Sequence, residues 1–144
     1  NHTCAAKAYT KALSKAPKAY DVAGALGIEL VKVGDHDRAI LTFQNFFSHE
    51  DGESVHKQHY AIALSKAEYL DDATEWFYKA LQADAKNFDA AQDLIKHLVN
   101  NENYTEALAV INHYNTVFPK QTLRQWTKTR NEVTELYEKY TNQY

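Results

Sequence analysis

Turn-forming and sulfur-containing residues are scarce in this chain of 144 residues, which has two prolines, four glycines, one cysteine and no methionine. The single Cys4 has no partner for an internal disulfide bond, which excludes a small secreted scaffold held together by disulfides. So few prolines and glycines leave little material for turns, and this favours long helices over many short strands. Because the chain begins at Asn1 and lacks methionine, we expect a fragment, cut from a longer polypeptide or processed at its start.

The sequence also lacks a long apolar run and a strong excess of either charge. No stretch of about 18 apolar residues occurs, so we expect no membrane span, and no secretory signal pattern is present. The 16 basic and 19 acidic residues give a net charge of −3, which offers no reason to expect nucleic acid as a partner. We expect a soluble chain, with the cytoplasm favoured among compartments that the residues do not otherwise distinguish.

A fixed spacing of 34 residues runs through the chain. An alanine followed four residues later by a larger apolar residue recurs with this period (39 − 5 = 34, and likewise for the later pairs), at Ala5 and Tyr9, Ala39 and Phe43, Ala73 and Phe77, and Ala107 and Ile111. Pro17 and Pro119, the only prolines, are 102 residues apart, which is three times 34. A period of 34 residues is typical of a stacked array of helix–turn–helix units.

This register predicts an all-α fold with the following parts. Residues 1–19 form the second helix of a truncated repeat, 20–53, 54–87 and 88–121 form full repeats, and 122–144 form a C-terminal capping helix, all in one continuous domain. Pro17 and Pro119 close their units, and Gly34 forms a left-handed cap after the first helix of 20–53. Gly27 lies inside that helix, where we expect it to allow close approach of another helix.

The second helices follow short polar turns. We expect the second helix of 20–53 to span about 37–49, after which residues 50–53 form an acidic connection. Asp71 and Asp72 are expected in the turn before the next second helix, as capping groups, and Tyr104 in the corresponding later turn.

The terminal segment 122–144 has lost the alanine-then-aromatic pattern. Its larger residues instead recur at intervals of three and four, at Leu123, Trp126, Arg130, Val133, Tyr137, Tyr140 and Tyr144. A helix that covers the last repeat is the preferred interpretation, because an end repeat needs a polar outer face. A short coiled-coil seam for self-association is the alternative, weakened by Arg130 in the stripe and by the small number of heptads.

The repeating residues resemble the tetratricopeptide repeat over residues 20–121. The resemblance depends on Leu26-Gly27, Leu30, Gly34, Ala39, Phe43 and Asp51, on Tyr60-Ala61, Leu64, Leu70, Ala73, Phe77 and Ala80, and on Leu94, Leu98, Tyr104, Ala107 and Pro119. It implies a right-handed α-solenoid whose first helices line a concave groove that holds a peptide or helix of a partner. Two departures stand out: the usual first-helix tryptophan is absent, and Phe46 and Tyr114 occupy an alanine slot, which predicts wider local helix spacing.

The resemblance places side chains next to the packing stripe of each first helix in the groove. These candidate partner-binding residues are Asp21, Ile28 and Lys32, then Gln58, His59, Ile62 and Lys66, then Asp89, Gln92, Asp93 and Lys96, with Gly24, Ala25 and Val55 on the same faces.

Some members of this family clamp the C-terminal carboxylates of chaperones with basic and amide side chains, and the matching slots here differ. They hold Gly24, Ile28, His59, Asp89 and Asp93, so the carboxylate clamp is absent and the two aspartates would repel an acidic tail. Asp89 and Asp93 instead predict a partner that carries lysine or arginine.

Catalytic and metal chemistry find little support in the sequence. His56 and His59 are three residues apart, near His49 and Glu53, but a closed zinc site needs about four ligands, so exposed histidines are the preferred interpretation. Cys4 has no orienting acid or oxyanion donor, and the helical Gly24 and Gly27 form no phosphate loop. We therefore predict no metal, no cofactor and no enzymatic activity.

One helix face carries a basic stripe of Lys7, Lys11 and Lys15. We interpret it as a solvated helix face, with binding of an anionic partner or lipid surface as the alternative.

The predicted function is a non-catalytic adaptor or scaffold domain for protein–protein interaction. Three alternatives stay open: a self-assembly module forming a homo-oligomer, a regulatory or docking domain of a larger enzyme, and a bacterial secretion-type tetratricopeptide chaperone.

Overall fold

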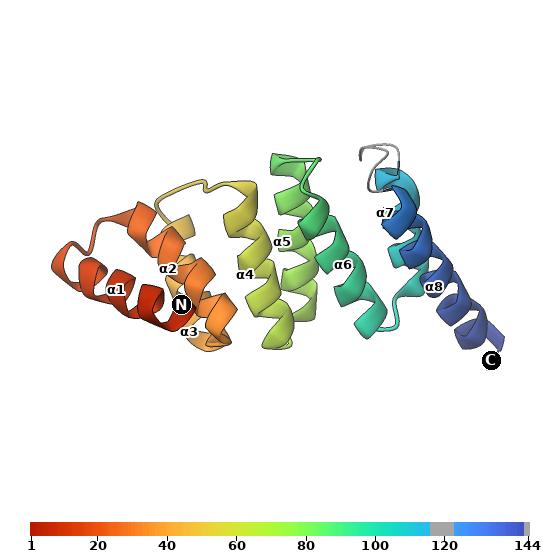
Figure 1. Ribbon diagram of the computed structural model, residues 1–144, viewed down its shortest axis with the longest axis horizontal. Helices are drawn as coiled ribbons and strands as arrows, with labels where there is room; N and C mark the ends of the chain where they lie inside the picture. Colours follow the sequence, from red (N-terminus) through yellow and green to blue (C-terminus); the bar gives the residue numbers. More distant parts are fainter. Residues whose placement is uncertain (116–122, 143–144) are drawn as a thin grey trace. The chain divides into compact units, whose positions relative to one another are not determined.

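The chain is helical, as Figure 1 shows. The computed structural model describes residues 1–115 and 123–142, with side chains described for 1–115 and 127–142. This part of the chain contains helices and no strand: α1 (His2–Lys15), α2 (Tyr20–Val33), α3 (His36–Phe47), α4 (Ser54–Lys66), α5 (Leu70–Ala83), α6 (Phe88–Asn100), α7 (Tyr104–Tyr114) and α8 (Leu123–Asn142). The prediction of an all-α fold is confirmed.

The helices begin in step with the 34-residue period. Steps of 34 separate the starts of α1, α3, α5 and α7, and the same step separates the starts of α2, α4 and α6. The helical-repeat architecture predicted from the alanine and aromatic spacing is therefore confirmed. The division at 20–53, 54–87 and 88–121 stays a prediction, as does the continuity of one domain, because the chain forms two compact units, Asn1–Ala83 and Asp84–Tyr144.

Local sequence explains where the first helices end. Gly34 ends α2 in the left-handed conformation, at φ 87° and ψ 10°, as predicted, and its N–H donates to the carbonyls of Leu30 and Val31. The Asp35 side chain then accepts the backbone N–H of Arg38 and starts α3. Two residues therefore suffice to reverse the chain between α2 and α3.

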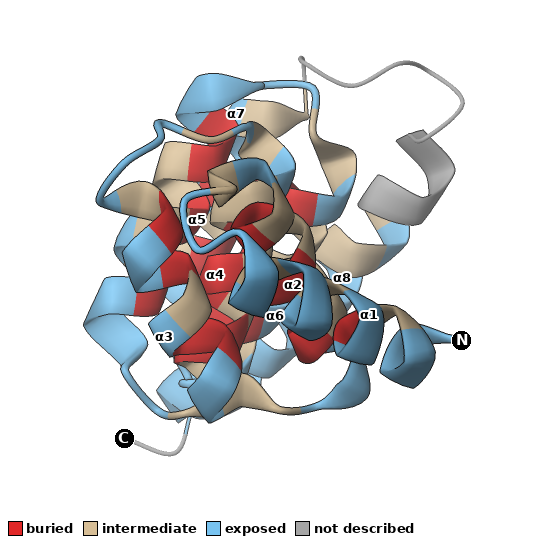
Figure 2. Cartoon of the chain, turned by 90° about the vertical axis from the view of Figure 1, so that its left-hand side faces the viewer, coloured by how far each residue is buried: buried red, intermediate tan, exposed pale blue. Residues whose placement is uncertain are grey.

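In the first unit, each helix packs against its neighbours in the chain, and α2 also contacts α4. The buried positions form bands along the helices, as Figure 2 shows. Ala39, Phe43, Ala73 and Phe77, which carry the repeat signal, are all buried. Small alanines let the helices approach, and the aromatic rings fill the space between them.

An aromatic cluster joins α3, α4 and α5 in the first unit. The ring of Phe47 lies 4.6 Å from Trp76 and 5.5 Å from Tyr60, and Phe43 lies 5.6 Å from Tyr60, measured between centroids. Tilted and edge-on contacts at these distances add to the free energy gained by burying the rings.

In the second unit, α7 packs against both α6 and α8. The buried residues are Ala90, Ala91, Leu94, Ile95, His97, Leu98, Ala107, Val110, Ile111 and Val133. Among the described side chains of α8, Val133 is buried, and this helix packs against α7, as expected of a capping helix.

Some predicted positions differ from those observed. Asp71 and Asp72 lie in the first turn of α5, and Tyr104 is the first residue of α7, whereas the sequence placed them in the preceding turns. The second helix predicted over 37–49 is α3, which ends at Phe47. Helix ends depend on the final turn, and sequence patterns locate them to within a residue or two.

Predictions for Pro119 and Tyr144 lie outside the described residues, as do those for the side chains of Leu123 and Trp126. Among the helices that are described, none has the length and apolar character to cross a membrane.

Candidate partner-binding site

A pocket of about 480 Å³ lies between α6 and α8 in the second unit. We call it the α6–α8 pocket. The residues that line it are Phe88, Asp89, Gln92, Asp93, Ile95, Lys96 and Val99 of α6, and Thr129, Glu132, Val133 and Leu136 of α8. Asp89, Gln92, Asp93 and Lys96, the groove residues predicted on this helix, therefore come together in one hollow.

The helical period explains why these four side chains share a face. Positions 89, 92, 93 and 96 are spaced at i, i+3, i+4 and i+7, which lie on one side of an α-helix. The neighbouring stripe of Ala91, Leu94 and Leu98 is buried. Asn87 caps α6 by accepting the Ala90 N–H at 3.1 Å, which fixes where the first turn begins.

The lining of the pocket combines apolar surface with an excess of acid. Three acids, Asp89, Asp93 and Glu132, and one base, Lys96, belong to the lining. Leu136 is partly exposed at 37%, and Val133 is buried beside it. A ligand segment that carries a positive charge next to an apolar side chain complements this lining.

The wall contributed by α8 was not predicted as part of a binding site. The sequence pattern identified 122–144 as a cap, and the groove prediction was confined to the first helices of the repeats. A signal was nevertheless present in the register: α6 begins at Phe88, and α8 begins at Leu123, one residue beyond the next 34-residue step. The capping helix α8 therefore begins at the point in the sequence where the first helix of a further repeat would begin.

The groove residues predicted in the first unit lie on α2 and α4. Asp21, Lys32 and Lys66 are exposed, and Ile28, His59 and Ile62 are half-buried. Gln58 is only 7% exposed, so its side chain offers little surface to a partner. Asp21 lines a pocket of about 630 Å³ at the start of α2, together with residues of the α3–α4 connection.

Both histidines of α4 form hydrogen bonds with backbone atoms at the start of this helix. The Nδ1 atom of His56 accepts the backbone N–H of Glu53 at 3.0 Å, and Nδ1 of His59 lies 2.8 Å from the carbonyl oxygen of Val55. In the part of the chain that the structure describes, no group of three or more His, Cys, Asp and Glu residues is placed to hold a metal ion.

The cap formed by His56 predicts a dependence of stability on pH. Burial lowers the pKa of His56, the Glu53 charge opposes this shift, and the neighbouring His59 adds to it. The folded protein therefore favours the neutral ring, and a protonated Nδ1 could no longer accept the Glu53 N–H. The free energy of unfolding should be level above about pH 6.5 and fall as the pH drops from there through the lowered pKa of the folded state.

Urea unfolding between pH 5 and pH 8 measures this effect. His56→Gln keeps an acceptor for the Glu53 N–H but cannot titrate, so the fall in stability should become shallower. His113→Gln, at an exposed position, is the control. In this variant the free energy of unfolding should fall with decreasing pH as steeply as in wild type. An identical slope in wild type and His56→Gln would contradict the assignment.

Comparison with known proteins shows similarity at the level of the fold. No family model and no curated protein matches the sequence. A crystal structure of MamA has a TM-score of 0.74 at 15% identity, over 96% of this chain and 90% of that chain. A second MamA structure, from AMB-1, has a TM-score of 0.69 at 20% identity, over 76% of this chain and 65% of that chain.

A third similar structure is that of Naa15/Naa10 bound to HypK-THB, with a TM-score of 0.67 at 17% identity. The match covers 91% of this chain and 20% of that chain. MamA and Naa15 are helical repeats of the tetratricopeptide type. The chain therefore has a tetratricopeptide-type fold, as its resemblance predicted.

Proposed function

We propose that this tetratricopeptide-type helical repeat is a non-catalytic interaction domain that binds a peptide or helix of another protein. The observation that carries the proposal is the α6–α8 pocket. Asp89, Gln92, Asp93 and Lys96, which the resemblance to the tetratricopeptide repeat placed in a groove, line this hollow together with residues of α8. A concave, partly apolar pocket with a few convergent polar groups is the usual form of a binding site.

The lining favours a basic partner. Three carboxylates against one ammonium group attract a lysine or arginine side chain and repel an acidic tail. The partly exposed Leu136 offers apolar surface for a flanking side chain. One similar structure, Naa15/Naa10, is bound to HypK-THB, which supports a binding role for this kind of scaffold.

Affinity measurements on a partner captured with the wild-type protein test the proposal. Asp89→Ala combined with Asp93→Ala should weaken binding roughly tenfold, or about 1.4 kcal/mol, and the loss should shrink at high salt. The double variant Glu135→Ala/Glu138→Ala removes two exposed charges from α8 outside the pocket. This matched control should bind within about twofold of wild type, since distant surface charges contribute little.

Two results would count against the proposal. If the Asp89/Asp93 variant bound as tightly as wild type, the acidic pocket would not be the site. If the control lost as much affinity as the pocket variant, the effect would arise from net charge and not from the α6–α8 pocket.

A further inference from the structure

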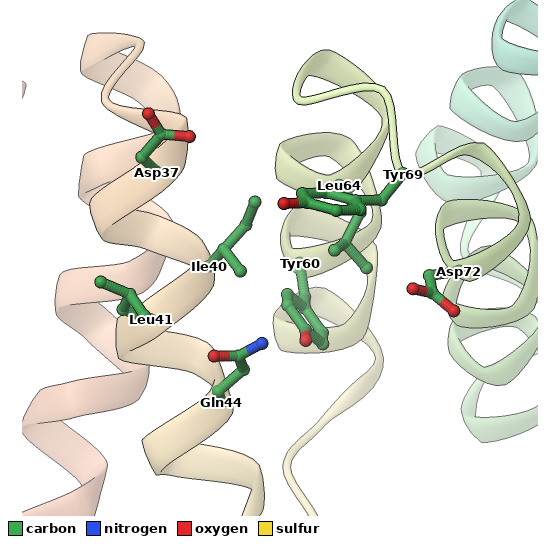
Figure 3. Close-up of a pocket in the computed structure, with 8 residues that line it drawn as sticks. All are labelled: Asp37, Ile40, Leu41, Gln44, Tyr60, Leu64, Tyr69 and Asp72. Atoms are coloured by element: carbon green, nitrogen blue, oxygen red, sulfur yellow. The ribbon is translucent and has the colours of Figure 1, made fainter.

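A second hollow lies in the first unit, among α3, α4 and the start of α5. We call it the α3–α5 cleft; it has a volume of about 390 Å³ and lies wholly within the first unit. Figure 3 shows Ile40 of α3 pointing toward α4, the helix that carries Tyr60 and Leu64. All three of these side chains are buried and form an apolar floor.

The rim of the cleft exposes large apolar side chains. Leu41 is 67% exposed and Tyr69 is 56% exposed, the two highest values among the exposed large apolar residues of the described chain. Both line the same hollow. A single exposed leucine needs no explanation, but an exposed leucine and tyrosine around one apolar hollow mark a surface that can be covered by a partner.

The charge of the cleft is entirely negative among the residues that line it. Asp37 and Asp72 are exposed on opposite walls, and no basic residue belongs to the lining. Arg38 follows Asp37 in the sequence but does not line the cleft. Its guanidinium group lies 3.5 Å from the Asp35 carboxylate and 3.4 Å from the Thr10 hydroxyl.

The charge of Asp72 acts on Tyr60 in the floor of the cleft. Burial raises the pKa of Tyr60, a hydrogen bond with the Gln44 side chain opposes this shift, and the negative charge of Asp72 adds to it. The Asp72 carboxylate turns toward α4 in Figure 3. A cation in this cleft would therefore lie among carboxylates and tyrosines, and both kinds of group attract cations.

The preceding repeat provides an internal comparison. A hollow of about 480 Å³ lies there among residues 34 positions earlier, where Thr3 replaces Asp37, Lys7 replaces Leu41, Asp35 replaces Tyr69 and Arg38 replaces Asp72. The same helix packing thus forms a hollow with a largely basic lining. Because the packing tolerates either lining, the acids and exposed apolar residues of the α3–α5 cleft are not required by the fold.

We propose that the α3–α5 cleft is a second docking site, for a partner segment that carries an arginine or lysine next to a leucine-sized apolar side chain. The cation pairs with a carboxylate at the rim of the cleft, Asp37 or Asp72, and the apolar side chain covers Leu41 and the floor. This site is separate from the α6–α8 pocket, so one chain can hold two segments.

The test uses two synthetic peptides, acetyl-Ala-Leu-Arg-Ala-Leu-Arg-amide and a twin with glutamate at each arginine position. Each is titrated into the isotopically labelled chain, and backbone amide shifts are followed by NMR. The arginine peptide should shift the amides around Asp37, Leu41 and Tyr69, and the glutamate twin should not. Asp37→Asn/Asp72→Asn should weaken the binding that produces these shifts at least tenfold.

A charge-matched control separates local recognition from the acidity of the whole chain. Glu50→Gln/Asp51→Asn removes two exposed acids from the same unit outside the cleft, and it should bind the arginine peptide within about twofold of wild type. Leu41→Ser should weaken binding without any change of charge.

Four results of the peptide titrations would overturn the proposal. These are an arginine peptide that shifts no amide around the cleft, a glutamate twin that binds equally well, equal losses in the cleft variant and its control, and shifts confined to α6 and α8. The last result would leave the α6–α8 proposal standing. If the chain self-associates and Lys7→Gln/Lys11→Gln abolishes this, the occupant is a second copy and the proposed partner is wrong.

Discussion

Replacing Phe43 by alanine is expected to remove about 3–5 kcal/mol from the free energy of unfolding. The ring of Phe43 is fully buried, and it contacts the rings of Phe47 and Tyr60 at centroid distances of 5.9 and 5.6 Å. The alanine variant loses the transfer free energy of the ring and leaves a cavity that neighbouring helices fill only partly. Since single domains are stable by about 5–15 kcal/mol, this one change should remove a large share of the total.

Urea unfolding followed by far-ultraviolet circular dichroism measures this loss. Leu41→Ala, two residues earlier on the same helix, is the control, because Leu41 is largely exposed and should cost no more than about 0.5 kcal/mol. Phe77, 34 residues later and equally buried, should behave like Phe43. Similar losses for Phe43→Ala and Leu41→Ala would contradict the packing described for α3.

The buried positions could be predicted from sequence because the packing repeats. Ala39, Ala73 and Ala107 are buried, and so are Phe43 and Phe77 beside them. Each of these residues has the same kind of neighbours in successive repeats. The 34-residue register therefore predicts both where the helices lie and which of their faces are buried. The Gly34 cap is predictable for a local reason, since few other residues tolerate the left-handed conformation.

Features that depend on neighbouring helices could not be predicted in this way. The sequence placed Gln58 in the groove, but its side chain is buried. The groove prediction also considered first helices alone, so it missed the wall from α8 and the cleft beside Leu41. Spacing within one helix shows which residues share a face, whereas the exposure of that face depends on the helices packed against it.

Phe46 illustrates how one residue compensates for another across helices. A phenylalanine in a slot that usually holds alanine predicted wider spacing between helices. Gly24 leaves room for the ring: a Cβ atom at this position would lie 2.9 Å from the Phe46 ring and 2.9 Å from Nε2 of His56. The sequence pattern identified Phe46 as a departure but did not connect it with Gly24, because their proximity is a property of the fold.

Adding a side chain at Gly27 is expected to lower the free energy of unfolding, as removing the side chain of Phe43 does. A Cβ atom at Gly27 would lie 2.7, 2.8 and 2.9 Å from three atoms of the Phe43 ring, which confirms the close approach predicted for this glycine. The ring is fully buried and cannot withdraw into solvent. Gly27→Val should therefore cost about 1–3 kcal/mol, although valine favours a helix slightly more than glycine does.

A double-mutant cycle shows whether the clash with Phe43 causes the loss at Gly27. Phe43→Leu removes the ring atoms that the new side chain would meet, so valine at position 27 should cost less in this background than in wild type. The expected coupling is about 0.5–3 kcal/mol, the range found for residues in contact. Additive losses in urea unfolding would show that the two positions do not compete for space. Coupling of this sign would instead show that the glycine is kept because α3 presents a phenylalanine to it, so the two residues form one packing unit across the turn.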